Sequence, residues 1–388
     1  MPTIQYRELK RRYELDGPDQ TVRHLSEALA KNEIKPEDFS LRDLAETMVP
    51  GGRQWVDLMS PRYEGDSVTE SSEGVDVTAF MNLTGRLIYH KILEAYRNES
   101  FILSKLVTTI PTQLDGERIP GAAPVRDDVT EIRPGMPYPH LGFGEDYIDT
   151  PSTTKRGLIV PVTREAIFFD RTHLVLSRAA EVGEILALNK EKRIADMILG
   201  LSTLYKWRGT SYSTYYTGSG ANDPWTNVLA SNELTSDAAV DAAENLFANM
   251  VDPNTDEAVL IEPDTVLVMP AKRHTANEIF STQNLIVSDG SLRSVANPFD
   301  HYRVVSSRIA WRRLLATNPS SETTLAQYWF MGNFAKAFAY MENWPITVTH
   351  SASGSEADFN QDIVVRYKAS ERGTPAVLNP RYVVKCTG

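Results

Sequence analysis

Potential metal ligands lie close together in the stretch HLGFGED, which contains His140, Glu145 and Asp146. Imidazole nitrogens and carboxylate oxygens bind Zn²⁺ and similar ions. This spacing, however, corresponds to no ligand set of known geometry. The other histidines are scattered along the chain, at His24, His90, His173, His274, His301 and His350. We therefore interpret His140 as a polar loop residue and predict that the chain has no metal site.

Residues that could support covalent or phosphate chemistry are equally isolated. Cys386 is the only cysteine, so no internal disulfide and no cysteine-based metal site can form. We expect its thiol to be inert, because a position close to the chain end provides no walls for an active site. Gly218-Ser219-Gly220 lacks the Lys-Ser/Thr ending of a phosphate-binding loop, and no nucleophile-elbow sequence is present. The sequence therefore predicts no catalytic or cofactor-binding residue, and a protein that is not an enzyme.

The charge distribution argues against a protein that grips nucleic acid. The formal net charge is -11, whereas proteins that grip nucleic acid by its phosphates display a basic face or stripe. Lys10-Arg11-Arg12 and Arg312-Arg313 are short basic clusters, which we interpret as solvated helix faces.

No feature of the sequence indicates a membrane or export. The apolar run Leu158-Ile159-Val160 is far too short to cross a bilayer, and the polar stretch Met1–Lys10 does not resemble a signal peptide. A single cysteine fits a reducing compartment such as a bacterial cytoplasm.

The stretch from Thr112 to Arg156 has little helical periodicity. Proline and glycine recur through it, at Gly116, Pro120, Gly121, Pro124, Pro134, Gly135, Pro137, Pro139, Gly142, Gly144 and Pro151. Compact domains rarely contain so long an irregular segment. It is nevertheless too apolar for a linker, with Val129, Ile132, Tyr138, Leu141, Phe143, Tyr147 and Ile148. We interpret it as a two-stranded arm whose apolar residues need a neighbouring molecule.

Helices are predicted on both sides of this arm. Residues 1–60 indicate short helices that are too polar to form a substantial core, with Thr21 and Ser40 as caps. Residues 62–76 are acidic and rich in serine, as in a linker, and 77–98 have apolar residues at helical spacing.

A long helix is predicted from His173 to Leu199. Its apolar residues follow one stripe and an adjacent face, at Val175, Ala179, Val182 and Leu186, then Ala187, Ile194, Met197 and Ile198. We place Glu191 on its solvated side, with Arg178, Glu181, Glu184 and Lys190. Gly183 costs about 1 kcal/mol relative to alanine in mid-helix, which indicates that a neighbouring backbone approaches closely there.

The remainder of the chain alternates between helical and strand patterns. Residues 201–232 are predicted to be a loop, followed by one helix after Ser236 and another from Pro270 to Phe280. Strands are predicted at 157–162, 259–261, 265–268, 302–305, 328–331, 337–349 and 362–367. This mixture predicts an α+β protein with more than one packed unit.

The order of these elements resembles the major capsid proteins of tailed bacteriophages, whose fold is shared with encapsulin shell proteins. Four stretches from about residue 77 onward carry the resemblance: Leu114–Gly121, Ile159–Asp170, Val266–Pro270, and Phe359–Tyr367 with the Arg372-Gly373 turn. The resemblance implies six segments: an N-terminal helical segment and arm (1–76), the first helix and strand of the peripheral domain (77–111), the extended loop (112–156), the spine-helix part of the peripheral domain (157–204), an axial α/β domain (205–340) and the peripheral C-terminal strands (341–388).

The function implied by this resemblance is structural. The chain would form pentamers and hexamers of an icosahedral head that encloses double-stranded DNA without sequence-specific binding. Its partners would be further copies, a portal protein, a scaffolding protein and a maturation protease, with no membrane involved. Assembly would take place in the host bacterial cytoplasm, and the protein would reside in the virion capsid.

Some relatives link their subunits through a lysine on the arm and an asparagine of the peripheral domain. Lys155 and Asn360 are the residues here that could form such a bond, although neither lies in a matching motif, and we interpret both as solvated. Two other functions stay open. An encapsulin-type compartment would also form closed shells, whereas an α/β enzyme that uses 112–156 as a lid would be a monomer or small oligomer.

Overall fold

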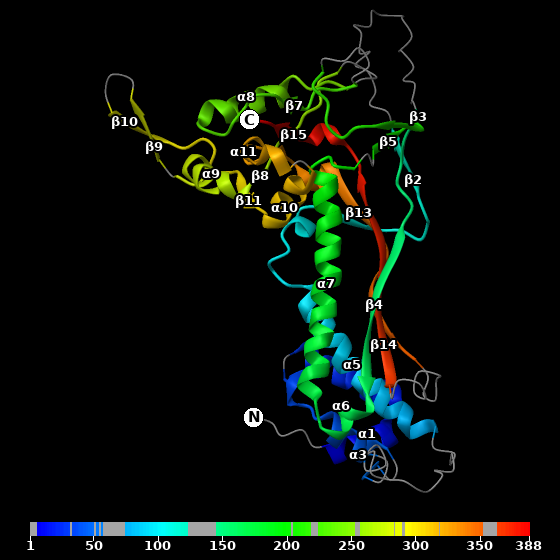
Figure 1. Ribbon diagram of the computed structural model, residues 1–388. Coiled ribbons are helices and arrows are strands. Elements are labelled where there is room, and N and C mark those ends of the chain that lie inside the picture. The colour runs from blue at the N-terminus through cyan, green and yellow to red at the C-terminus, as the bar shows by residue number, and fades with distance from the viewer. Residues whose placement is uncertain are drawn as a thin grey trace, which may run out of the picture. The chain divides into compact units, whose positions relative to one another are not determined.

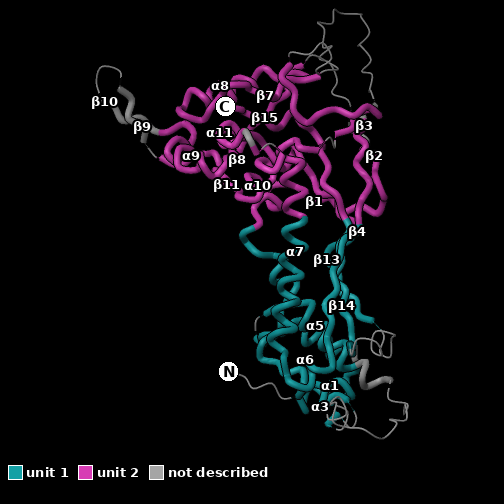
Figure 2. The backbone as a smooth tube through the Cα atoms, viewed as in Figure 1, with its two compact units in different colours: residues 1–100, 155–189, 344–372 teal, residues 101–154, 190–343, 373–388 magenta. Residues whose placement is uncertain are grey.

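The computed structural model describes residues 6–31, 33–49, 52–53, 56, 74–122, 145–202, 205–218, 224–252, 257–282, 284–288, 292–317, 319–351 and 363–388. The chain divides into two compact units, each built from three stretches of sequence (Figure 2). Unit 1 comprises Met1–Ser100, Lys155–Asn189 and Trp344–Arg372, and unit 2 comprises Phe101–Thr154, Lys190–Asn343 and Gly373–Gly388. Both contain helices and strands, so the predicted α+β class is confirmed (Figure 1).

The helices of unit 1 surround one apolar core. Their bounds are α1 Tyr6–Asp16, α2 Pro18–Ala30, α3 Leu41–Met48, α5 Gly74–Tyr96, α6 Arg164–Phe168 and the first part of α7 Thr172–Ile198. Helices α2 and α3 pack on α5 and place Leu29 and Leu44 in the core. The hydroxyl of Ser40 accepts a hydrogen bond from the Asp43 amide, as predicted for a cap. The predicted cap at Thr21 is wrong, because α2 already begins at Pro18, where proline suits a first helical turn.

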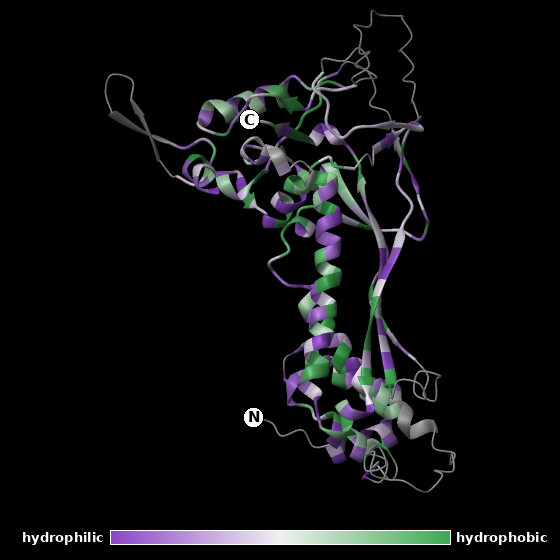
Figure 3. Cartoon of the chain, in the orientation of Figure 1, coloured by the Kyte–Doolittle hydropathy of each residue, from purple (hydrophilic) through white to green (hydrophobic). Residues whose placement is uncertain are grey.

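Helix α7 agrees closely with the predicted long helix. Val175, Ala179, Leu186, Ile194 and Ile198 are buried, and Figure 3 shows hydrophobic and hydrophilic segments alternating along it. The close approach inferred at Gly183 is also confirmed, since a Cβ at this position would collide with the carbonyl oxygen of Ile92 on α5. No described helix combines the length and hydrophobicity that crossing a membrane requires.

A sheet with the order β1-β13-β14-β4 contributes strands to both units. The bounds are β1 Thr108–Pro111, β4 Thr154–Thr163, β13 Phe338–His350 and β14 Ile363–Val377. The predicted turn at Arg372-Gly373 is wrong, because both residues lie inside β14, which is much longer than the pattern at 362–367 indicated. In unit 1 this sheet covers the helices, and Tyr367 donates a hydrogen bond to the carbonyl of Met81 on α5.

Unit 2 contains a five-stranded sheet between two apolar layers. Its order is β11-β8-β12-β15-β7, with bounds β11 Arg303–Ser306, β8 Thr265–Val268, β12 Trp329–Gly332, β15 Val383–Cys386 and β7 Val228–Leu229. Val266 and Trp329 face helices α8 Asp237–Ala248 and α9 Arg273–Phe280. Leu267 and Phe330 face α10 Arg308–Thr317 and the last turns of α7. Side chains alternate between two buried faces, which explains the continuous apolar runs.

Several smaller elements differ from the prediction. The predicted strand 259–261 is wrong: no strand forms there, and Leu260 is 91% exposed. The predicted loop 201–232 contains β5 Tyr205–Trp207, β6 Thr210–Tyr212 and β7. Other elements include β2 Arg118–Ala122, β3 Glu145–Asp149, a hairpin of β9 Asn284–Ser288 and β10 Leu292–Ala296, and the short helices α11 Glu322–Leu325, α12 Phe334–Ala337 and η2 Leu103–Lys105.

Candidate assembly surfaces

The base of the predicted arm is fixed to unit 2. Strands β2 and β3 pair antiparallel, and Ile148 of β3 pairs with Trp207 of β5, which places the arm base in a four-stranded sheet. Asp115 accepts hydrogen bonds from the backbone nitrogen and the hydroxyl of Thr153, at 2.8 and 2.9 Å. The arm base is therefore two-stranded and held in place. Residues 123–144, which include His140 and most of the apolar side chains predicted for the arm, lie outside the described residues.

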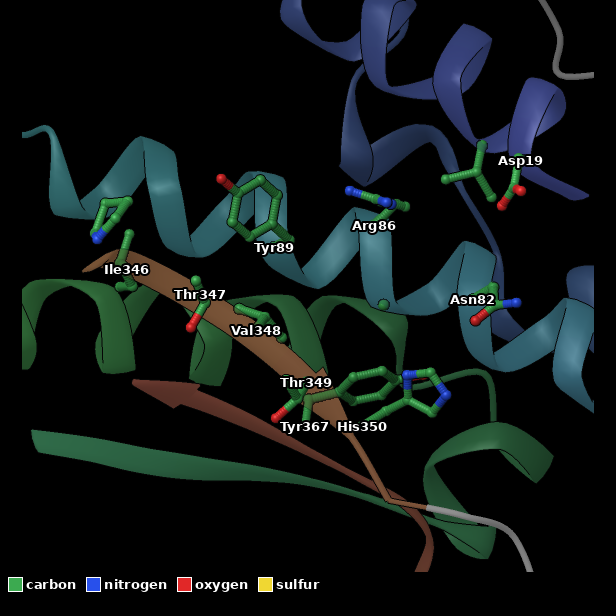
Figure 4. Close-up of a pocket in the computed structure, with 13 residues that line it drawn as sticks. Asp19, Asn82, Arg86, Tyr89, Ile346, Thr347, Val348, Thr349, His350 and Tyr367 are labelled. Atoms are coloured by element: carbon green, nitrogen blue, oxygen red, sulfur yellow. The ribbon is translucent and has the colours of Figure 1, made fainter. Parts of the chain in front are cut away.

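A groove of about 620 Å³ in unit 1 follows one edge of strand β13 (Figure 4). Strand β1 pairs with β13 only from Ala339 to Glu342, so the later residues of β13 have no strand neighbour on that side among the described residues. Ser351 donates its backbone N–H to Arg366 of β14. Because the bonding direction alternates along a strand, Val348 and His350 direct their backbone groups toward the groove.

The side chains of this groove come from four elements, α2, α5, β13 and β14. Arg86 and Tyr89 project from α5, Asp19 from α2, and the His350 ring lies 6.3 Å from that of Tyr367 (Figure 4). The combination of an open strand edge and polar walls could accept an extended segment of another chain by main-chain pairing.

The opposite edge of the same sheet exposes apolar side chains. Strand β4 is the edge strand, and Leu158 and Ile159 are 36% and 54% exposed, whereas Val160 is buried. Exposed apolar residues on an edge strand favour association with another chain unless something covers them. The run Leu158-Ile159-Val160 thus has two side chains on the surface and one in the core.

Of the two residues considered for a covalent link, the structure describes only Lys155. The amine of Lys155 lies 5.8 Å from the centroid of the Trp344 ring, and the guanidinium of Arg372 lies 5.6 Å from it. Asn360 lies outside the described residues. The interpretation of Lys155 and Asn360 as solvated residues without a covalent link is therefore untested and stays a prediction.

The other candidate ligands show no site within the described part of the chain. No group of three or more His, Cys, Asp or Glu residues that could hold a metal ion occurs there. His173 is exposed at the start of α7, and His274 lies 3.3 Å from Glu278 one turn along α9. Residues 219–223, which include Ser219 and Gly220, are not among those described.

Cys386 lies in the core rather than in an open tail. It is the last residue of β15, is fully buried, and packs in the same apolar cluster as Trp329 and Met331. Burial raises the pKa of its thiol to about 12. The absence of walls inferred from its position is wrong, but the thiol is protonated at neutral pH, and the thiolate is the reactive form.

The position predicted for Glu191 is wrong. Its side chain is 1% exposed, and its carboxylate accepts hydrogen bonds from the backbone nitrogens of Leu103 and Ser104, at 2.6 and 2.9 Å. Burial raises the pKa of this carboxyl. One signal was available: Glu191 stands four residues after Ala187 and three before Ile194, in register with the buried face.

The cluster Arg312-Arg313 divides into two environments. The guanidinium of Arg313 donates two hydrogen bonds to the carboxylate of Asp196 on α7, both at 2.6 Å, so this residue is an ion-paired anchor. Arg312 is exposed, as predicted. The bidentate geometry joins α10 to the last turns of α7 within unit 2.

Comparison with known families decides the assignment. A model described as "Phage capsid protein" matches residues 147–386, which is more than half of the sequence. The chain belongs to the phage capsid protein family. The resemblance to tailed-phage major capsid proteins is therefore confirmed. No curated protein matches the sequence.

Solved structures are similar to this phage capsid protein only at low identity. The mature capsid of bacteriophage PhiM1 is 13% identical, with 74% of this chain and 86% of that chain covered and a TM-score of 0.44. The structure of Mycobacterium phage Ogopogo is 13% identical, covering 85% and 97%, with a TM-score of 0.42. A virus-like particle from Pyrococcus furiosus is 12% identical, covering 76% and 96%, with a TM-score of 0.38.

Proposed function

We propose that this protein is the structural subunit of an icosahedral phage head, which assembles into pentamers and hexamers and encloses double-stranded DNA. The observation that carries the proposal is the match of 147–386 to the phage capsid protein family. The described surfaces support a role in assembly rather than catalysis, because they offer an open strand edge and exposed apolar residues.

In this proposal the predicted segments have separate roles in the shell. Residues 205–340 form the axial domain that meets its copies around the symmetry axes, and 157–204 and 341–388 belong to the peripheral domain. The extended loop 112–156 lies over an adjacent subunit, with its base held by Asp115 and Thr153. Identical interlocking contacts around closed symmetry axes limit the size of the assembly.

The partners of such a subunit follow from its role. A portal protein occupies one vertex, a scaffolding protein and a maturation protease act during assembly, and DNA is enclosed without sequence-specific contacts. The subunit assembles in the host cytoplasm, remains in the virion and catalyses no reaction.

Electron microscopy of the protein expressed with the structural genes of its own phage tests this proposal. The expected result is closed icosahedral shells built from this chain, with DNA inside after packaging. Particles no larger than a dimer would contradict a capsid function, and closed shells that hold an enzyme instead of DNA would indicate a protein compartment.

A further inference from the structure

Helix α10 of unit 2 presents an exposed row of positive charge. Its sequence, RIAWRRLLAT, contains three arginines and no acidic residue. Arg308 and Arg312 are both exposed. Residues four apart lie on the same helical face, about 6 Å apart along the axis, so these two guanidinium groups project from one side.

The opposite side of α10 is firmly anchored. Ala310 and Leu314 are buried in the apolar layer that includes Leu267 of β8. Arg313 forms its bidentate pair with Asp196 of α7. Because packing and this ion pair fix the helix, the exposed row is held on a rigid element, as a binding surface requires.

Two further exposed cations lie on α7 and on η2, which are bonded to each other. Lys192 is exposed on α7, one turn before Asp196. Lys105 is exposed on η2, and η2 is held against α7 through the bonds from Leu103 and Ser104 to Glu191. We call the exposed face of α10 that carries Arg308 and Arg312 the cationic surface of unit 2.

Two acidic groups lie on the elements that contact α10. Asp196 is already bonded to Arg313, and Glu322 is exposed on α11, which packs on α10. Within the described part of the chain, none of the four cations forms an ion pair. A protein with a net charge of -11 therefore keeps a local surplus of exposed positive charge.

We propose that the cationic surface of unit 2 binds the phosphates of the packaged double-stranded DNA. The proposal rests on the function proposed above, since it places this surface in contact with the enclosed genome. Guanidinium groups match phosphate oxygens in geometry, and contacts with phosphates alone carry no sequence preference. The surface therefore binds any duplex, and the binding weakens with salt because counterions are released.

Binding of a fluorescent duplex of random sequence to the purified full-length protein, measured by anisotropy over a series of salt concentrations, tests the proposal. The test variant is Arg308→Gln with Arg312→Gln. The matched control is Arg7→Gln with Arg11→Gln, because these two arginines are also exposed and four apart on a helix, α1. The net charge changes equally in both variants. Circular dichroism establishes that both remain folded.

The expected result is that wild type binds the duplex and that the α10 variant makes the negative slope of log K against log salt shallower by about 1.8, since each phosphate contact contributes about 0.9 to its magnitude. The control variant should keep the wild-type slope. Absence of wild-type binding at low salt, equal slopes in all three proteins, or an equal loss in the control overturns the proposal. So does binding of an acidic peptide, but not DNA, that depends on Arg308 and Arg312.

Electron microscopy of the same variants separates this proposal from the proposed function. If the α10 variant forms normal shells and loses DNA affinity, both stand. If it forms normal shells and binds DNA as wild type does, only the DNA surface is wrong. If wild type forms no shells under any condition, the capsid function itself fails.

Discussion

The carboxylate of Glu191 lies 2.6 Å from the backbone nitrogen of Leu103, a residue 88 positions earlier in the sequence. Together with the bond to Ser104, this contact fixes η2 against helix α7. A buried carboxylate that accepts backbone hydrogen bonds replaces the water that the free amides would otherwise bind. Glu191 is thus a structural anchor of unit 2.

Replacing Glu191 by alanine should destabilise the protein strongly. The change leaves the N–H groups of buried Leu103 and half-buried Ser104 without an acceptor, at a cost of about 1–3 kcal/mol for a buried unsatisfied group. Urea unfolding of the subunit below its assembly concentration measures the loss. Glu184→Ala, at an exposed position of the same helix, is the control and should change the free energy of unfolding by less than about 0.5 kcal/mol.

The pH dependence of this anchor has a definite sign. Burial raises the pKa of Glu191 above its ordinary value of 4.5, so the folded state binds a proton more readily than the unfolded state. Stability from this group is fully present below pH 4.5 and is lost as the pH rises through the folded pKa. Relative to Glu191→Gln, wild type should lose stability over that window. A wild type that gains stability relative to Glu191→Gln as the pH rises would contradict this assignment.

Gly183→Ala should destabilise unit 1, although alanine is the better helix former by about 1 kcal/mol. The added methyl group would meet the carbonyl of Ile92 and the side chain of Ala95 on α5. We expect a net loss of about 1–3 kcal/mol in the free energy of unfolding. Glu184→Ala, exposed on the same helix, is the control. A more stable Gly183→Ala protein would show that α5 and α7 do not pack this closely.

Cys386 should react with thiol reagents only after unfolding. Its thiol is buried and its pKa is raised to about 12, so thiolate is scarce at neutral pH. Ellman's reagent at pH 8 should give no rapid colour with the folded protein and one equivalent in denaturant. Rapid reaction of the folded protein would place the end of β15 outside the core.

Ile159→Asp should impair assembly while leaving the subunit folded. Ile159 is 54% exposed on the edge strand β4, so a charge there costs the isolated subunit little but would be buried without a partner in an interface. Circular dichroism checks the fold and electron microscopy counts the shells. Lys368→Asp, exposed on the neighbouring strand β14, is the comparison variant, because this position already carries a charge in the wild type. Normal shells from Ile159→Asp would remove this strand from the assembly surfaces.

The sequence predicted the features that depend on local periodicity. The apolar stripe of α7 and the collision site at Gly183 were both visible, because they follow from helical spacing and from the cost of glycine. The strand 259–261 was predicted from a short apolar run, yet Leu260 is exposed there. Short apolar runs do not reveal whether a partner strand exists.

What the sequence could not show are contacts between distant segments. Glu191 was assigned to water because carboxylates are usually exposed, and its partners lie far away in the chain. Cys386 was treated as a tail residue because nothing nearby shows that β15 lies inside a sheet. The hydrogen bonds between Asp115 and Thr153, which join the two ends of the arm base, could not be predicted because the two residues are far apart in the sequence.

Sedimentation velocity of the purified full-length protein under assembly conditions tests the central claim most directly. The claim is that the chain belongs in a closed lattice of many copies. It predicts particles of uniform size that sediment fast and are far heavier than the 43.4 kDa chain. A single slow species of monomer mass, unchanged by concentration, crowding agents or scaffolding protein, would contradict it.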